Sequence, residues 1–107
     1  MTVMVLGTAY TVENRDNDPA LVDADGYCDW TTKTIVLARN VAGNLHDMGE
    51  YRKKVLRHEI VHAFLLESGL HECSGEVECW AANETMVDWI ARQGAKIYKA
   101  WEEAACV

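Results

Sequence analysis

The segment Leu56–Gly69 holds two histidines and a glutamate at the spacing H-E-x-x-H, namely His58, Glu59 and His62. On a helix, residues four apart lie on the same face, so the two imidazoles can aim at a single point. Zinc binds histidine nitrogen at about 2.0–2.1 Å and therefore needs rigidly convergent ligands of this kind. Glu59 projects beside them, where it can take a proton from a water at the metal. The spacing predicts two zinc ligands and one general base.

A third ligand has to come from elsewhere, because a catalytic zinc takes three protein ligands and keeps one position for water. The motif N-E-x-x-x-D at positions 83–88 places two carboxylates one helical turn apart. Glu84 can supply the third ligand oxygen. Asp88 can accept a hydrogen bond from the nitrogen of a ligand histidine that faces away from the metal.

Other ligand sets stay open. A thiolate of Cys73 or Cys79 could close a structural zinc site with the two histidines, and His71 lies in the same segment. Glu76 or Glu78 could replace Glu84 if the second helix turned differently. The H-E-x-x-H spacing can also arise by chance, with both histidines hydrogen-bonded in a metal-free core.

H-E-x-x-H followed by N-E-x-x-x-D resembles the signature of the gluzincins, the thermolysin-like metallopeptidases. The resemblance implies that His58, His62 and Glu84 are zinc ligands, that Glu59 is the general base, and that Asp88 orients a ligand histidine. The match covers only the two helices. The whole sequence also resembles short zincin-like proteins of phages and prophages, distantly related to ImmA/IrrE-type metallopeptidases.

One part of the gluzincin pattern is not found. Gluzincins usually carry a further histidine or tyrosine downstream that stabilises the oxyanion of the transition state. No histidine follows Glu84 in this chain. Tyr98 is a possible substitute, although nothing in its spacing identifies it.

The first part of the chain predicts a small antiparallel or mixed sheet of about three strands. Val3–Glu13 is rich in β-branched residues and could hold one strand, followed by strands at Tyr27–Trp30 and Thr34–Ala38. The loop before them is rich in turn formers, with a short helical turn at Ala20–Val22. Because a chain of 107 residues favours one domain, residues 1–107 are expected to form a single unit.

The second part predicts two helices. Asp47 with Glu50 three residues on has capping-box spacing, and Ser68-Gly69 is a suitable helix end. Another helix is expected from about Glu76 to Tyr98, interrupted at Gly94, with Trp80 and Trp89 packing it against the first. Strands followed by helices indicate an α+β class, here a minimal zincin-like fold with the sheet packed on the active-site helix and the second ligand helix.

The net charge of −7 argues against nucleic-acid binding, which usually requires a basic patch. The basic cluster Arg52, Lys53, Lys54 and Arg57 is interpreted as the solvated side of a helix. No secretory signal or membrane-spanning run is visible, so a cytoplasmic protein with free cysteines is expected.

These observations lead to the hypothesis of a zinc metallopeptidase that acts on a peptide or protein substrate. The resemblance to zincins implies that the strand at Lys33–Arg39 borders the cleft and binds an extended peptide by strand addition. The alternative is a non-catalytic, zinc-stabilised binding module of the phage or prophage type. The sequence does not indicate the oligomeric state.

Overall fold

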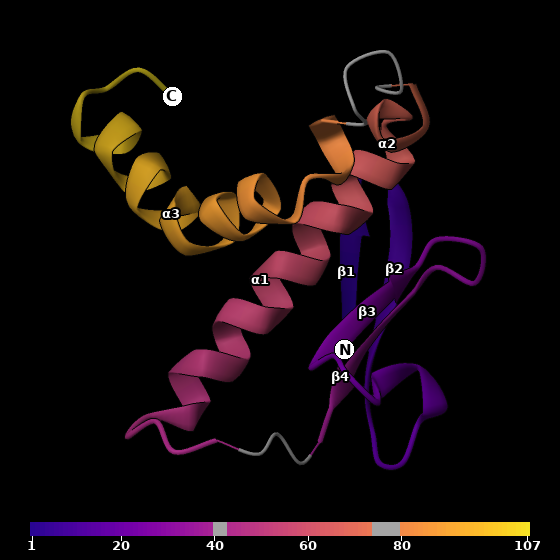
Figure 1. Ribbon diagram of the computed structural model, residues 1–107. Coiled ribbons are helices and arrows are strands. Elements are labelled where there is room, and N and C mark those ends of the chain that lie inside the picture. Colours follow the sequence, from indigo (N-terminus) through magenta and orange to yellow (C-terminus); the bar gives the residue numbers. More distant parts are fainter. Residues whose placement is uncertain (40–42, 74–79) are drawn as a thin grey trace.

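The computed structural model describes residues 1–39, 43–73 and 80–107, in which a mixed sheet packs on one long helix and a second long helix crosses the first (Figure 1). The elements are β1 (Thr2–Val5), β2 (Thr8–Arg15), η1 (Pro19–Leu21), β3 (Gly26–Asp29), β4 (Thr34–Ala38), α1 (Met48–Glu67), α2 (Leu70–Cys73), η3 (Trp80–Ala82) and α3 (Glu84–Glu103). The expected α+β class is confirmed.

The sheet has four strands in the order β1-β2-β4-β3, so the expectation of about three strands was wrong. The run interpreted as one strand is a hairpin, in which Val5 pairs with Thr8 across a two-residue turn. Both turn residues, Leu6 and Gly7, have positive φ angles, 50° and 84°. This is the backbone of a primed turn. Because leucine is not a turn former, the sequence Val3–Glu13 shows no clear turn and was predicted as one strand.

The strand order also corrects the expected edge of the sheet. β4 lies inside the sheet, parallel to β2 and antiparallel to β3. The predicted edge at Lys33–Arg39 was therefore wrong, and β3 is the edge strand on this side. The strand boundaries predicted for β4 were right, but the sequence holds no signal that the chain returns to pair with β2.

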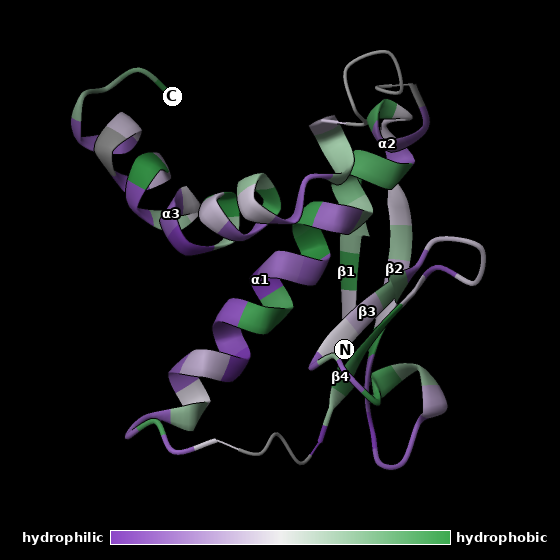
Figure 2. Cartoon of the chain, in the orientation of Figure 1, coloured by the Kyte–Doolittle hydropathy of each residue, from purple (hydrophilic) through white to green (hydrophobic). Residues whose placement is uncertain are grey.

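Helix α1 begins where its capping residue predicts. The carboxylate of Asp47 accepts a hydrogen bond from the backbone N–H of Glu50 at 3.0 Å. The helix ends before Ser68 and Gly69, and Gly69 has a φ of 84°, which suits a glycine at a helix C-terminus. Apolar and hydrophilic residues alternate along α1 (Figure 2). Its buried residues Val55, Glu59 and Ala63 recur every four positions and define one inner face.

The core between α1 and the sheet is small and apolar. Its buried members are Val5, Tyr10, Val12, Ile35 and Ala63. At the end of α1 the carboxylate of Glu67 ties the helix to this sheet, because it accepts a hydrogen bond from the Tyr10 hydroxyl at 2.7 Å and pairs with Lys33. These contacts fix the axis of α1 relative to the strands.

Tyr10→Phe is expected to lower the free energy of unfolding by about 1–2 kcal/mol at pH 7, because it removes a buried hydrogen bond to a charged group. Urea unfolding of the two proteins measures the difference. The pairing with Lys33 and Tyr10 lowers the pKa of Glu67 below its ordinary value of 4.5. A carboxylate with a lowered pKa stabilises the fold above the unfolded pKa and loses that contribution as the pH falls through the folded one. The difference in free energy of unfolding between wild type and Tyr10→Phe should therefore shrink below about pH 4.5. A difference that grew as the pH fell would contradict this account.

Helix α3 differs from its expected limits. It begins at Glu84 and continues past Tyr98 to Glu103, and Gly94 does not interrupt it. The expected start near Glu76 lies outside the described residues. A Cβ atom at Gly94 would meet nothing within 4 Å, so this glycine marks no close approach and no break.

The tryptophans were predicted to pack α3 against α1, and this was wrong. Trp80 and Trp89 are 45% and 56% exposed. The small residues Ala81, Val87 and Ala91 are buried instead, which lets the two helices approach closely. Among the helices of the described residues, none combines the length and hydropathy that a membrane span requires.

Candidate metal centre

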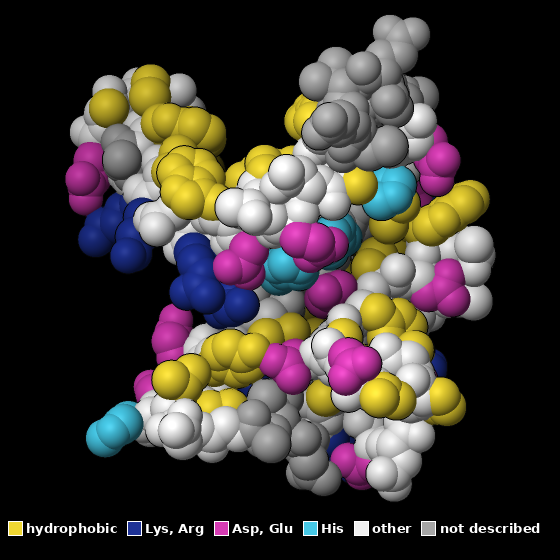
Figure 3. All heavy atoms as spheres, viewed as in Figure 1, with side chains coloured by type: hydrophobic (Ala, Val, Ile, Leu, Met, Phe, Trp, Pro, Cys, Tyr) yellow, Lys and Arg dark blue, Asp and Glu magenta, His cyan; other side chains and the backbone are white. Residues whose placement is uncertain are grey.

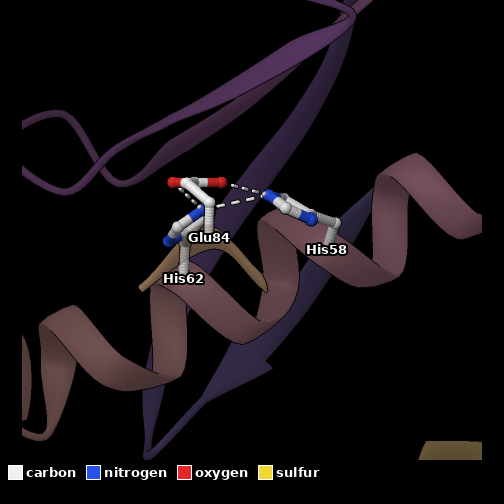
Figure 4. Close-up of side chains that lie close together, drawn as sticks. All are labelled: His58, His62 and Glu84. Atoms are coloured by element: carbon white, nitrogen blue, oxygen red, sulfur yellow. Dashed lines mark hydrogen bonds and ion pairs between the residues drawn. The ribbon is translucent and has the colours of Figure 1, made fainter. Parts of the chain in front are cut away.

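Two helices bring the predicted ligands to one place. His58 and His62 lie one turn apart on α1, and Glu84 is the first residue of α3. Figure 4 shows the two imidazoles and the Glu84 carboxylate pointing toward one another. The long separation in sequence is closed by the contact between α1 and α3.

The ligand atoms converge at the spacing that a small cation needs. Nε2 of His58 lies 3.1 Å from Nε2 of His62 and 3.0 Å from one oxygen of Glu84. The other oxygen of Glu84 lies 3.1 Å from Nε2 of His62. Tetrahedral zinc with bonds of about 2.0–2.1 Å holds its ligands about 3.3 Å apart. An opening of a few tenths of an ångström would fit this group around zinc.

Asp88 determines which nitrogen of His58 faces the other ligands. Its carboxylate lies 3.0 Å from Nδ1 of His58 and also accepts hydrogen bonds from Arg92 at 2.8 Å and Lys54 at 3.1 Å. The bonds from Arg92, and then from Lys54 and His58, hold the pKa of Asp88 well below its usual range. An ionised carboxylate only accepts, so Nδ1 donates to it, and in the neutral imidazole Nε2 then carries the lone pair that faces His62 and Glu84.

The charge balance of the group favours a cation. Burial lowers the pKa of His62, which keeps the imidazole neutral and able to ligate a metal. With Nε2 unprotonated on both imidazoles, two nitrogens and a carboxylate would face each other with acceptor atoms only. Such a set is mutually repulsive unless a proton or a metal ion lies between its members. The donor set of two nitrogens and one carboxylate oxygen is that of a catalytic zinc site.

Glu59 is the one buried charged residue of the described chain, with 6% of its surface exposed. Burial raises its pKa to about 7, and Glu84 adds to this, whereas His58 opposes it. A carboxylate oxygen of Glu59 lies 4.0 Å from Nε2 of His58, beside the ligands. Gly26 of β3 makes room for it, since a Cβ there would lie 3.3 Å from Cγ of Glu59 and 3.0 Å from the carbonyl oxygen of Val36.

These groups line a pocket of about 470 Å³ between β3, α1, α2 and the start of α3. Figure 3 shows histidine and acidic side chains gathered in this hollow. The sequence interpretation missed several of its lining residues: Asp25, Gly26, Cys28, Tyr51 and Lys54. Tyr51 precedes His58 by two helical turns, so its position on the same face was a usable signal. The β3 residues are placed by the sheet order and carried no signal.

The alternative ligands divide into two groups. Glu76, Glu78 and Cys79 lie outside the described residues, as does the side chain of Cys73. His71 lines the pocket and contributes to the lowered pKa of His62. The one cluster of metal-binding side chains found among the described residues is His58, His62 and Glu84.

Two further candidates do not fit a role at the metal. Burial raises the pKa of the Cys28 thiol to about 12, and although Cys28 lines the pocket it is not one of the three convergent side chains. Tyr98, the substitute considered for the oxyanion, is 52% exposed and does not line the pocket.

Comparison of the chain with protein-family models, with curated proteins and with solved structures gave no match. The resemblance to gluzincins and to phage zincin-like proteins therefore stays a prediction. The function has to be argued from the side chains of the pocket.

Proposed function

We propose that this chain is a zinc-dependent metallopeptidase that acts on a cytoplasmic peptide or protein. The observation that carries the proposal is the meeting of His58, His62 and Glu84 at metal-binding distances, with the buried carboxylate of Glu59 beside them. A structural histidine pair would not need a buried carboxylic acid at its side. A hydrolase does, because its attacking water must lose a proton.

The side chains have separate roles in this proposal. Zinc held by His58, His62 and Glu84 would polarise the scissile carbonyl and lower the pKa of the attacking water. Glu59 accepts the proton of that water and returns it to the leaving amine. Its raised pKa suits both transfers near neutral pH. Asp88 keeps the imidazole of His58 in the tautomer that binds metal through Nε2.

The edge strand β3 offers a way to hold a peptide in the pocket. Within the described part of the chain β3 pairs with β4 on one side only, and its residues Gly26–Cys28 line the pocket. An extended peptide can add to such an edge through backbone hydrogen bonds. This would draw the peptide past Glu59 and the two histidines, so β3 replaces β4 as the substrate strand of the hypothesis.

The test of the proposal is hydrolysis of a fluorogenic peptide library by the zinc-loaded protein. Cleavage should be lost when a chelator removes the zinc and should return when zinc is added back. Metal analysis should give about one zinc per chain. Zinc binding without cleavage of any library member or protein substrate would contradict the peptidase proposal.

The second candidate is a zinc-stabilised binding module without catalysis. It is favoured by the position of His71, which lines the same pocket and influences His62. His71 as a fourth protein ligand, and a third imidazole, would occupy the position that a peptidase keeps for water. In that case zinc would raise the melting temperature of the chain without any hydrolysis.

A further inference from the structure

We call the pocket lined by His58, Glu59, His62 and Glu84 the metal pocket. Another hollow, of about 450 Å³, lies next to it between α1 and α3. Four cationic side chains line it, Lys54, Arg57, Arg92 and Lys96, which we call the cationic groove. The whole chain has ten lysines and arginines and a net charge of −7, so four of ten cations gather here. Figure 3 shows lysine and arginine side chains along the hollow beside α3.

The groove corrects one interpretation of the sequence. The basic cluster at positions 52–57 was assigned to the solvated side of a helix. Arg52 and Lys53 are exposed, as expected. Lys54 and Arg57 instead turn toward α3, where Lys54 pairs with Asp88 and Nε of Arg57 donates to the carbonyl of Ala91 at 2.6 Å. The two helices therefore concentrate positive charge at their junction.

The acidic residues of this hollow offset only part of that charge. Asp47, the cap of α1, and Glu50, which lies 3.9 Å from Nη2 of Arg57, leave the lining with two more positive than negative charges (four minus two). Beside the hollow, Asp88 pairs with Lys54 and Arg92. Among the described residues, Lys96 takes part in no ion pair. Donors with positive charge thus remain available to a ligand.

The cationic groove and the metal pocket adjoin each other. Lys54 and Tyr51 line both hollows. Seven residues of helix separate Tyr51 from His58, which corresponds to about 10 Å. An extended peptide covers that distance with about three residues. A peptide held at the metal that ran along α1 toward Tyr51 would therefore place a side chain in the groove.

We infer that the cationic groove binds an acidic side chain, so that the preferred substrates carry aspartate or glutamate about three residues from the scissile bond. The inference rests on the proposed peptidase function, because it takes the metal pocket as the site of cleavage. Positive groups in a partly enclosed groove attract a carboxylate through charge-assisted hydrogen bonds.

Binding to the zinc-loaded Glu59→Gln protein tests this without relying on turnover. The probes are dye-labelled ten-residue peptides of alanine and glycine that differ only in one Glu, Gln or Lys, moved through each position. At the best position Glu should bind about five- to tenfold more tightly than Gln at low salt, and Lys more weakly than Gln. Half-molar salt should remove most of this preference.

A pair of charge-reversed variants locates the effect. Lys96→Glu, made on the Glu59→Gln protein, should abolish the preference for Glu over Gln. Lys53→Glu makes the same change on the exposed side of α1, outside the groove, and should keep the preference. The inference is wrong if no Glu peptide binds, if Glu and Gln peptides bind equally, or if the two variants behave alike. If the wild-type protein cleaves no peptide while its Glu59→Gln variant shows the preference, the proposed function is contradicted and the acidic ligand of the groove stands.

Discussion

Glu59→Gln is expected to reduce peptide hydrolysis by about a hundred- to ten-thousandfold while one zinc stays bound. Glutamine keeps the size of the side chain and one acceptor oxygen but cannot accept a proton from water. Because Glu59 lies 4.0 Å from Nε2 of His58 and is not one of the three convergent ligands, the metal should remain. The measurements are kcat/KM on the best library peptide and zinc content by metal analysis.

A matched substitution separates this effect from a change in the fold. Glu102→Gln alters a carboxylate of the same type at an exposed position of α3 and should cleave at the wild-type rate. If the Glu59→Gln protein hydrolysed peptide as fast as the wild type, Glu59 would have no part in the mechanism. If the variant lost its zinc as well as its activity, Glu59 would be a ligand instead of a base.

Glu84→Gln is expected to weaken zinc binding by at least about a hundredfold, because one of three protein ligands loses its charge. In the wild type, zinc at a hundred times its dissociation constant should stabilise the fold by about 2.7 kcal/mol, which would raise the melting temperature by several degrees. In the variant the same zinc concentration should stabilise the fold by less than about 0.5 kcal/mol. Thermal melts with and without zinc measure both effects.

The side chain of Glu84 is 70% exposed, so the variant should fold like the wild type without metal. This makes the zinc-dependent part of the melting temperature a specific readout. A full stabilisation by zinc in Glu84→Gln would contradict the assignment of the third ligand. It would direct attention to Cys73, Glu76, Glu78 and Cys79, the alternatives that the sequence leaves open.

The sequence predicted those features that depend on local chemistry. The cap at Asp47, the end of α1 and the common face of His58 and His62 follow from residues within one or two helical turns. The placement of Glu84 and Asp88 beside them also agrees with the sequence prediction. That prediction used the resemblance to a known signature, since no local pattern states which helices pack together.

The features that the sequence did not predict depend on partners far along the chain. The residues of β4 predict a half-buried strand, but they do not indicate whether that strand lies inside the sheet or at its edge. The tryptophans read as core residues by their size, yet buried alanine and valine leave no space for them between α1 and α3. The charge on Lys54 and Arg57 was visible, whereas its meeting with Arg92 and Lys96 required the packing of the helices.

The central claim is that three side chains from α1 and α3 hold one metal ion. Anomalous diffraction at the zinc edge, on crystals grown with zinc, tests it most directly. The account predicts one peak about 2.0–2.1 Å from Nε2 of His58, Nε2 of His62 and a carboxylate oxygen of Glu84. The absence of a peak between the two imidazoles, or a peak there with Glu84 turned away, would contradict it.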